Sequence, residues 1–186
     1  MLRIKPLLIS FENLKVMLMK HKFFLLYSWF VRTLLFFLPD QPSIMKFRGW
    51  MYGLGMNRCG SNFQVSANVV IKGLENFLVG DDCYLAPGVV VNAIQYVELD
   101  CQVMIGFNSV LVSGNHSKSN GSYRFGKSRS APIYIGFGSW VAANSTVVAG
   151  ASIGSGVVIG ANSFVKGNFS DDSVYVSLIP KKLGDS

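Results

Sequence analysis

The stretch IGFGSWVAANSTVVAGASIGSGVVIGANSF, from Ile135 to Phe164, repeats with a period of six residues. Each hexad begins with Ile or Val, and its fifth residue is Ser, Ala or Val. A period of six fits no α-helix, but it is typical of short parallel strands joined by tight turns. We expect the first residue of each hexad to point into a narrow triangular prism. The fifth residue must be small, because it faces inward near a corner.

The same period begins much earlier in the chain. Aligned hexads start at Val79, and FQVSAN (63–68) and VVIKGL (69–74) are a degraded start of the pattern. Two extra residues, Val97 and Glu98, interrupt the count. Glycine is expected at the turns, where a positive φ is needed. An ordinary sandwich would instead show a period of two with variable spacing. The sequence therefore predicts a mainly β protein, a parallel β-helix from about residue 60.

One segment breaks the repeat. SGNHSKSNGSYRFG runs from Ser113 to Gly126, and the hexads are absent from residues 113–131. The chain therefore leaves the prism and returns after an excursion, with His116 at the exit. Its Gly and Ser content predicts a segment that is mobile without substrate. A solvated surface loop is one interpretation, and an active-site loop on a rigid scaffold is the other.

The N-terminal third combines basic charge with an apolar run. Residues 1–60 hold nine Lys and Arg against two acidic residues, whereas the rest of the chain is neutral. The run FFLLYSWFVRTLLFFL (23–38) contains Arg32 and is shorter than the roughly 20 apolar residues of a membrane span. Ser28 and Arg32 would share a narrow polar stripe on a helix. We therefore favour a helix in the membrane interface, with residues 1–42 making peripheral contact. The alternative is a helical arm packed on a neighbouring subunit.

The composition excludes several classes of protein and site. A nucleic-acid reader would show a basic face on its folded module, and the neutral repeat region has none. Three cysteines without a CxxC pair and only two histidines make a structural metal site improbable, so we expect no metal. A reducing, cytoplasmic setting follows, at the inner face of the cytoplasmic membrane if the N-terminal segment binds lipid.

The motifs VMIGFNSVLVSGNHS and APIYIGFGSWVAANSTVVAGASIGSGVVIGANSFV resemble the hexapeptide-repeat acyltransferases, in the branch that O-acetylates sugars and polysaccharides. The resemblance covers roughly residues 60–182 and implies a left-handed parallel β-helix. It also implies a homotrimer whose active sites lie between neighbouring prisms, with acetyl-CoA as the acyl donor. We therefore divide the chain into a helical segment at 1–47, a β-helix domain at 48–182 and a tail at 183–186.

The resemblance assigns roles by position. His116 matches the catalytic general base, Trp140 would wall the site and orient the substrates, and Asn92 would help hold the acceptor or the thioester. The Ala143 amide would stabilise the oxyanion, and the pantetheine arm would pass Ala161. The phosphates of coenzyme A would meet Lys166, Lys181 and Lys182. Taken alone, Trp140 could be packing, Asn92 could cap a corner, and the paired lysines could be a solvated tail.

Chemistry within the excursion suggests where the acceptor binds. Tyr123 offers an aromatic face to a sugar ring, and Arg124 offers a fork for hydroxyls or phosphate. Asn115, beside His116, is the third candidate. The chain departs from the family pattern at FVKGN, where VVTKD is usual, so the phosphate contacts are the weakest part of the assignment.

Three functions follow from these observations. The first is an acetyl-CoA-dependent O-acetyltransferase that acts on a cell-surface polysaccharide or its lipid-linked precursor. The second is an acetyltransferase for a soluble small molecule such as a free sugar, an antibiotic or an amino acid. The third is a non-catalytic β-helix that scaffolds glycan synthesis.

Overall fold

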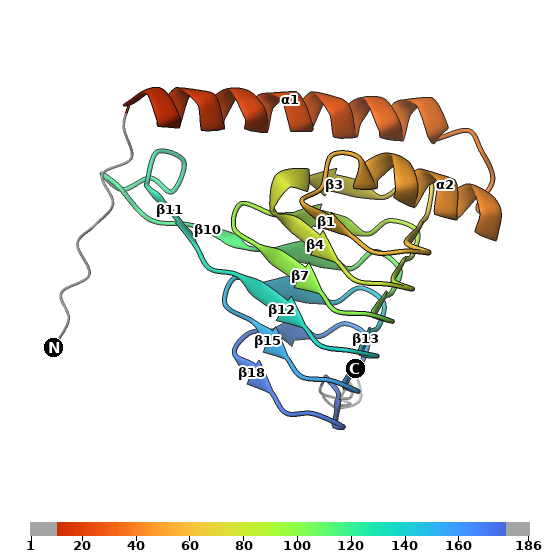
Figure 1. Cartoon of the computed structure of the whole chain (residues 1–186). Coiled ribbons are helices and arrows are strands. Elements are labelled where there is room, and N and C mark those ends of the chain that lie inside the picture. Colours follow the sequence, from red (N-terminus) through yellow and green to blue (C-terminus); the bar gives the residue numbers. More distant parts are fainter. Residues whose placement is uncertain (1–10, 178–186) are drawn as a thin grey trace, which may run out of the picture.

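The computed structural model describes residues 11–177, with side chains described from Met19 onward. It is a β-solenoid of six coils, capped at its N-terminal end by two helices (Figure 1). The strands form three parallel sheets, which we call faces A, B and C. The prediction of a mainly β repeat fold with N-terminal helices is confirmed.

The chain visits the three faces in turn. Face A contains β1 (Arg58–Cys59), β4 (Phe77–Val79), β7 (Val97–Leu99), β12 (Ile133–Ile135), β15 (Ser152–Ile153) and β18 (Asn168–Phe169). Face B contains β2 (Gln64–Val65), β5 (Tyr84–Leu85), β8 (Met104–Ile105), β13 (Trp140–Val141), β16 (Val158–Ile159) and β19 (Val174–Tyr175). Face C contains β3 (Val70–Lys72), β6 (Val90–Asn92), β9 (Val110–Val112), β14 (Thr146–Val148) and β17 (Phe164–Val165).

The hexad positions behave as the period predicts. All first-position side chains from Val79 to Val165 are buried in the prism. Small fifth-position residues are buried as well, and their hydroxyls bond to the adjacent coil. Ser139 Oγ donates to the Gly154 carbonyl at 2.7 Å, and Ser109 Oγ donates to the Ala142 carbonyl at 2.9 Å. The fifth position therefore combines a small volume with an internal hydrogen bond.

The first coil corrects the predicted frame of the repeat. Val65 pairs with Leu85, and Ile71 pairs with Val91, so the hexads begin two residues later than FQVSAN and VVIKGL suggested. A 3-10 turn, η1 (Leu74–Asn76), adds residues before face A and shifts the count. Glycine holds seven positions with positive φ among the described residues, as expected, but other residue types hold the rest. Several left-handed positions are held by Asn or Asp, whose short side chains tolerate positive φ.

The two helices cover the open end of the prism. α1 (Phe11–Leu35) packs on β3 and η1, and α2 (Pro42–Gly53) packs on β2. Ser28, Val31 and Leu35 on α1 are buried, and Ser28 Oγ donates to the Ile71 carbonyl at 2.5 Å. The predicted polar stripe is therefore wrong for Ser28, because its hydroxyl faces the solenoid. In the described part of the chain, no helix has the length and apolarity needed to cross a membrane.

Arg48 locks the helices to the first coil. Its side chain is buried, and Nη1 lies 2.6 Å from Asp40 Oδ1. The same guanidinium donates to the carbonyls of Leu35, Leu38 and Val65. Arg48 thus contributes nothing to a basic surface, which reduces the free positive charge counted from the sequence.

Candidate active site

The excursion forms a β-hairpin that projects from the corner between faces C and A (Figure 1). β10 (Gly114–His116) pairs in antiparallel register with β11 (Ser128–Ser130), and His116 lies opposite Ser128. Sequence analysis placed the excursion correctly but assigned it no strands. The hairpin gives His116 a defined backbone position at the surface of a rigid scaffold.

The base of the hairpin is anchored inside the solenoid by Ser113. This residue is fully buried, and its hydroxyl accepts the Gln95 N–H at 2.8 Å and donates to the Gln95 carbonyl at 2.7 Å. The Ser113 N–H donates to the Asn92 carbonyl at 3.2 Å. The structure therefore brings Asn92, a predicted site residue, to the point where the hairpin leaves. Ser113 was not among the predicted site residues, and its only signal in the sequence is a hydroxyl residue where the repeat fails.

The far end of the hairpin closes in a two-residue turn. Ser119 and Ser122 exchange backbone hydrogen bonds around Asn120 and Gly121, both of which have positive φ. An Asn-Gly pair is the common sequence for such a turn. This dipeptide was the signal that could have predicted the hairpin, and its two short flanking strands are too polar to be recognised by hydrophobic alternation.

His116 and the candidate acceptor residues share this hairpin. The His116 side chain is exposed, and its backbone N–H donates to Asn115 Oδ1 at 2.8 Å. Tyr123 and Arg124 follow the turn and are exposed, and the Arg124 guanidinium lies 5.7 Å from the centre of the Phe125 ring. The hairpin thus offers an imidazole, an aromatic ring and a guanidinium on one projecting element.

A second group of predicted residues lies along face B. Trp140 begins β13 and points outward, with Met104 and Val158 as its neighbours in the adjacent coils. Ala143 and Ala161 follow at equivalent positions of successive coils, where the Asn162 N–H donates to the Ala143 carbonyl at 2.9 Å. Because both residues are alanines, the corner between faces B and C carries no large side chain at these two positions.

The two groups lie apart within one chain. The hairpin leaves between faces C and A, whereas Trp140 and the alanines lie on face B and at its border with face C. In Figure 1 the hairpin and β13 lie on opposite sides of the solenoid. Lys166 is exposed just after β17, at the corner where faces C and A meet. Lys181 and Lys182 lie outside the described residues.

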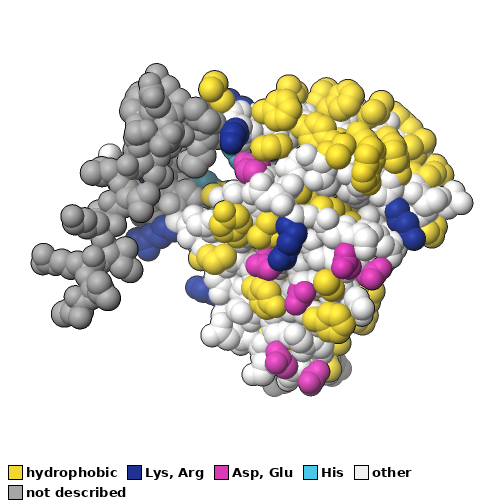
Figure 2. All heavy atoms as spheres, in the orientation of Figure 1, with side chains coloured by type: hydrophobic (Ala, Val, Ile, Leu, Met, Phe, Trp, Pro, Cys, Tyr) yellow, Lys and Arg dark blue, Asp and Glu magenta, His cyan; other side chains and the backbone are white. Residues whose placement is uncertain are grey.

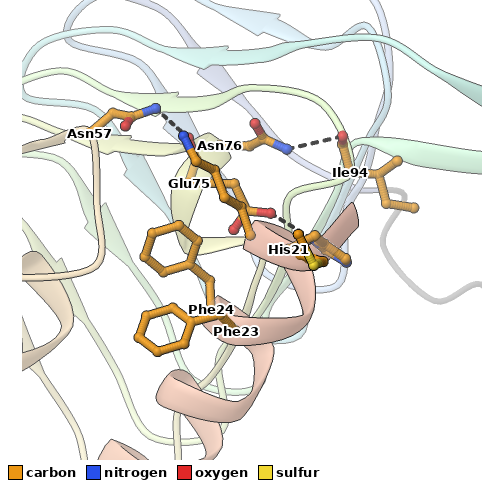
Figure 3. Close-up of a pocket in the computed structure, with 9 residues that line it drawn as sticks. His21, Phe23, Phe24, Asn57, Glu75, Asn76 and Ile94 are labelled. Carbon is orange, nitrogen blue, oxygen red and sulfur yellow. Dashed lines mark hydrogen bonds and ion pairs between the residues drawn. The ribbon is translucent and has the colours of Figure 1, made fainter. Parts of the chain in front are cut away.

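A pocket of about 790 Å³ lies between residues 19–24 of α1 and the corner around η1 (Figure 3). His21 Nδ1 lies 2.5 Å from Glu75 Oε1, so this histidine of α1 is paired with a carboxylate at the edge of the pocket. Ile94 also lines the pocket and packs against Gly114, where a Cβ would come within 2.3 Å of Ile94 Cδ1. The pocket therefore adjoins the base of the His116 hairpin.

Other chemistry is limited by the side chains present. Among the described residues, His, Cys, Asp and Glu form no group of three that could hold a metal ion. The three cysteines are free. Burial raises the pKa of Cys83 to about 11, so its thiol stays protonated at neutral pH.

The later coils of the repeat match a known family. The family described as bacterial transferase hexapeptide (six repeats) matches residues 132–167. This part of the chain therefore carries the hexapeptide repeat of that family. The match falls on β12 to β17, the coils that follow the hairpin and carry Trp140, Ala143 and Ala161.

Among curated relatives, WbbJ of Escherichia coli strain K12 is 29% identical over 132 residues, and its name describes a lipopolysaccharide biosynthesis O-acetyl transferase. The match covers 71% of this chain but only 61% of that protein's length.

Two solved structures share the fold. A maltose O-acetyltransferase from Clostridium difficile 630 has a TM-score of 0.75 at 19% identity, covering 92% of this chain and 90% of its own. An acetyltransferase from Vibrio cholerae, solved with acetyl coenzyme A, has a TM-score of 0.73 at 17% identity, covering 95% and 91%. At these identities, the similarity establishes the fold that the three proteins share.

Proposed function

We propose that this protein transfers an acetyl group from acetyl-CoA to a sugar hydroxyl in a cell-surface polysaccharide or its lipid-linked precursor. The observation that carries the proposal is the position of His116. The repeat is interrupted once between Val79 and Val165 by a full excursion, and that excursion presents an exposed histidine on a hairpin anchored by buried Ser113. The proteins to which it is similar include one named as a lipopolysaccharide biosynthesis O-acetyl transferase and one named as a maltose O-acetyltransferase.

The chemistry requires a base beside the acceptor. The neutral His116 imidazole takes the proton of the sugar hydroxyl as the oxygen attacks the thioester carbonyl. The new C–O bond forms a tetrahedral intermediate, whose oxyanion the Ala143 N–H stabilises. The C–S bond then breaks, and the departing sulfur takes the proton from the imidazolium. The products are the acetylated sugar and free coenzyme A, so the step needs no other reactant.

The donor is assigned to face B. Trp140 orients the thioester, and the pantetheine arm follows the alanine-lined corner past Ala161. The phosphates of coenzyme A are assigned, as the family resemblance implies, to Lys166, Lys181 and Lys182. Because His116 and Trp140 lie on different sides of one solenoid, we propose that each site forms between two copies in a homotrimer. The hairpin of one copy would reach face B of its neighbour. We also propose that the coils are left-handed, as the family resemblance implies.

The acceptor is assigned to the hairpin. Asn115, Tyr123 and Arg124 project from the same element as His116, and Asn92 lies at its base. A tyrosine ring stacks on the apolar face of a sugar, and a guanidinium donates several hydrogen bonds in a fixed fork.

The test is acetyl transfer from labelled acetyl-CoA to a panel of acceptors: lipid-linked oligosaccharides, purified surface polysaccharides, and free sugars including maltose. We expect label that mild alkali removes, because an O-ester is hydrolysed where an amide is not. Labelling of free sugars alone would favour the second function, acetyl transfer to a soluble small molecule. The similarity to a maltose O-acetyltransferase supports that alternative. Absence of coenzyme A release with every acceptor would leave the scaffold function.

A further inference from the structure

The outer surface of α1 is the largest feature that the proposed function leaves unused. One side of this helix is fixed against the solenoid by Ser28, Val31 and Leu35, all of which are buried. Tyr27 strengthens the attachment, since its hydroxyl donates to the Met51 carbonyl at 2.6 Å. Because successive residues of an α-helix are about 100° apart, the side opposite these residues is determined.

That opposite side is a continuous apolar stripe. Its spacings of three and four residues place its members on one face of the helix and its C-terminal extension. Their exposed fractions lie between 49% and 86%. The outer stripe consists of Met19, Phe23, Leu26, Phe30, Leu34 and Phe37. Figure 2 shows hydrophobic side chains gathered along the edge of the molecule where α1 runs. A contiguous exposed patch of large apolar residues indicates a binding surface.

The exposed charges along the stripe are mainly basic, and Glu75 at its N-terminal end is paired with His21. Lys20 and Lys22 are exposed at the beginning of the stripe, and Lys46 is exposed on α2. Between residues 19 and 54 the only acidic residue is Asp40, and its carboxylate is occupied by Arg48 at 2.6 Å. Long basic side chains can keep their charge in the headgroup layer while apolar neighbours enter the lipid.

We propose that the outer stripe docks the protein on an anionic lipid membrane, with α1 lying parallel to the bilayer. α1 crosses the end of the solenoid, so the stripe points away from the coils along the prism axis (Figure 1). In a cyclic trimer of parallel prisms, neighbours pack side to side and all three ends face the same way. The three stripes then share one plane, which suits a flat bilayer and leaves them uncovered by neighbours.

Docking would also place the hairpin near the lipid surface. In Figure 1 the β10–β11 hairpin rises from its coil toward the level of α1. The acceptor would therefore reach His116 from the membrane side, which favours a lipid-linked precursor over a free sugar. This last step rests on the proposed function, whereas docking itself does not.

The test is flotation of the full-length protein with phosphatidylcholine vesicles, with or without phosphatidylglycerol. We expect binding that increases with phosphatidylglycerol and decreases with salt. The variant Phe23→Glu/Phe30→Glu should lose more than about tenfold of its partitioning, because charged side chains replace two rings that would otherwise be buried in the lipid. The matched control, Phe164→Glu/Val174→Glu, changes two equally exposed apolar residues in the last two coils and should bind like the wild type.

Substitution is a cleaner test than deletion of residues 1–42, because deletion would uncover the solenoid core that Val31 and Leu35 close. Equal flotation of the wild type and the double variant would overturn the proposal, as would failure of the wild type to bind anionic vesicles. A variant whose assembly shrinks in solution while its flotation is unchanged would show that a second copy covers the stripe instead. Vesicle binding is measured without acetyl-CoA, so its failure is distinct from a failure of acetyl transfer.

Discussion

The Ser117 carbonyl oxygen lies against Gly126 so closely that a Cβ on Gly126 would come within 1.6 Å of it. Ser117 Oγ also donates to the Lys127 carbonyl at 2.5 Å. These contacts join the two sides of the hairpin directly beyond His116. Only glycine permits this approach, so Gly126 is a structural requirement of the candidate site and not a sign of a flexible loop.

Replacing Gly126 with alanine should therefore displace the segment that follows His116. A shift of about 1 Å in a catalytic group can cost about a hundredfold in rate, and we expect a loss of that order in kcat. The melting temperature should change little, because the hairpin lies outside the solenoid core. Ser130→Ala, an exposed change on β11, is the control for both measurements. Unchanged kcat in Gly126→Ala would show that the hairpin does not position His116.

Trp140→Ala tests the donor side of the site. The indole is 43% exposed, so its removal should leave the solenoid folded. If it packs on bound acetyl-CoA, the loss of that contact should cost roughly 2 kcal/mol, or about thirtyfold in kcat/KM. Steady-state kinetics with varied acetyl-CoA measures this effect. Val174→Ala, two coils farther along the same face, should keep wild-type kinetics, and equal loss in both variants would contradict a specific role for Trp140.

The repeat was predictable because it depends on local chemistry. A β-branched or leucine side chain every sixth residue and a small residue four positions later can be read directly, and Val147 and Ser145 are buried as that pattern requires. The position of His116 followed from the same counting, because an excursion is visible as a gap in a strict period. Trp140 was assigned to the site only through the family resemblance.

Contacts between distant segments could not be predicted in this way. Glu75 lies 54 residues from His21, and Arg48 reaches carbonyls on α1 and on β2. A sequence shows charge but not which charges are buried, so Arg48 was counted with the surface basic residues. The first coil was misaligned for a related reason: η1 adds residues at a corner without a recognisable hexad signal.

Arg48→Met tests whether the buried guanidinium holds the helices on the solenoid. The change removes the guanidinium donor from several carbonyls and from the Asp40 carboxylate, which keeps the Ala67 N–H at 2.9 Å. Removal of one partner of a buried pair costs roughly 3–5 kcal/mol. Urea unfolding should show a loss near the lower end of that range, because Asp40 is partly exposed. Arg58→Met removes an exposed pair with Glu98 and should cost less than about 1 kcal/mol. Equal losses in the two variants would contradict the role of Arg48.

Cys83 should resist alkylation while the protein is folded. Its thiol is buried, Sγ donates to the Asp100 carbonyl at 2.9 Å, and burial raises its pKa to about 11. A raised thiol pKa keeps the unreactive protonated form up to strongly alkaline pH. Iodoacetamide at neutral pH, followed by peptide mass spectrometry, should label Cys83 only after unfolding in urea. Rapid labelling of the native protein would mean that the coil opens around this residue.

His116→Ala tests the proposed mechanism itself. A general base contributes about 10²–10⁴-fold, so kcat should fall by two to four decades. The fold should survive, because the side chain is exposed and fills no position in the prism. Ser128→Ala, on the residue paired with His116, keeps the imidazole and should retain most of the activity. Steady-state kinetics decides the matter, with circular dichroism as the folding control. A folded His116→Ala protein with near-normal kcat would remove His116 from the chemistry, and the hairpin would then serve only to bind the acceptor.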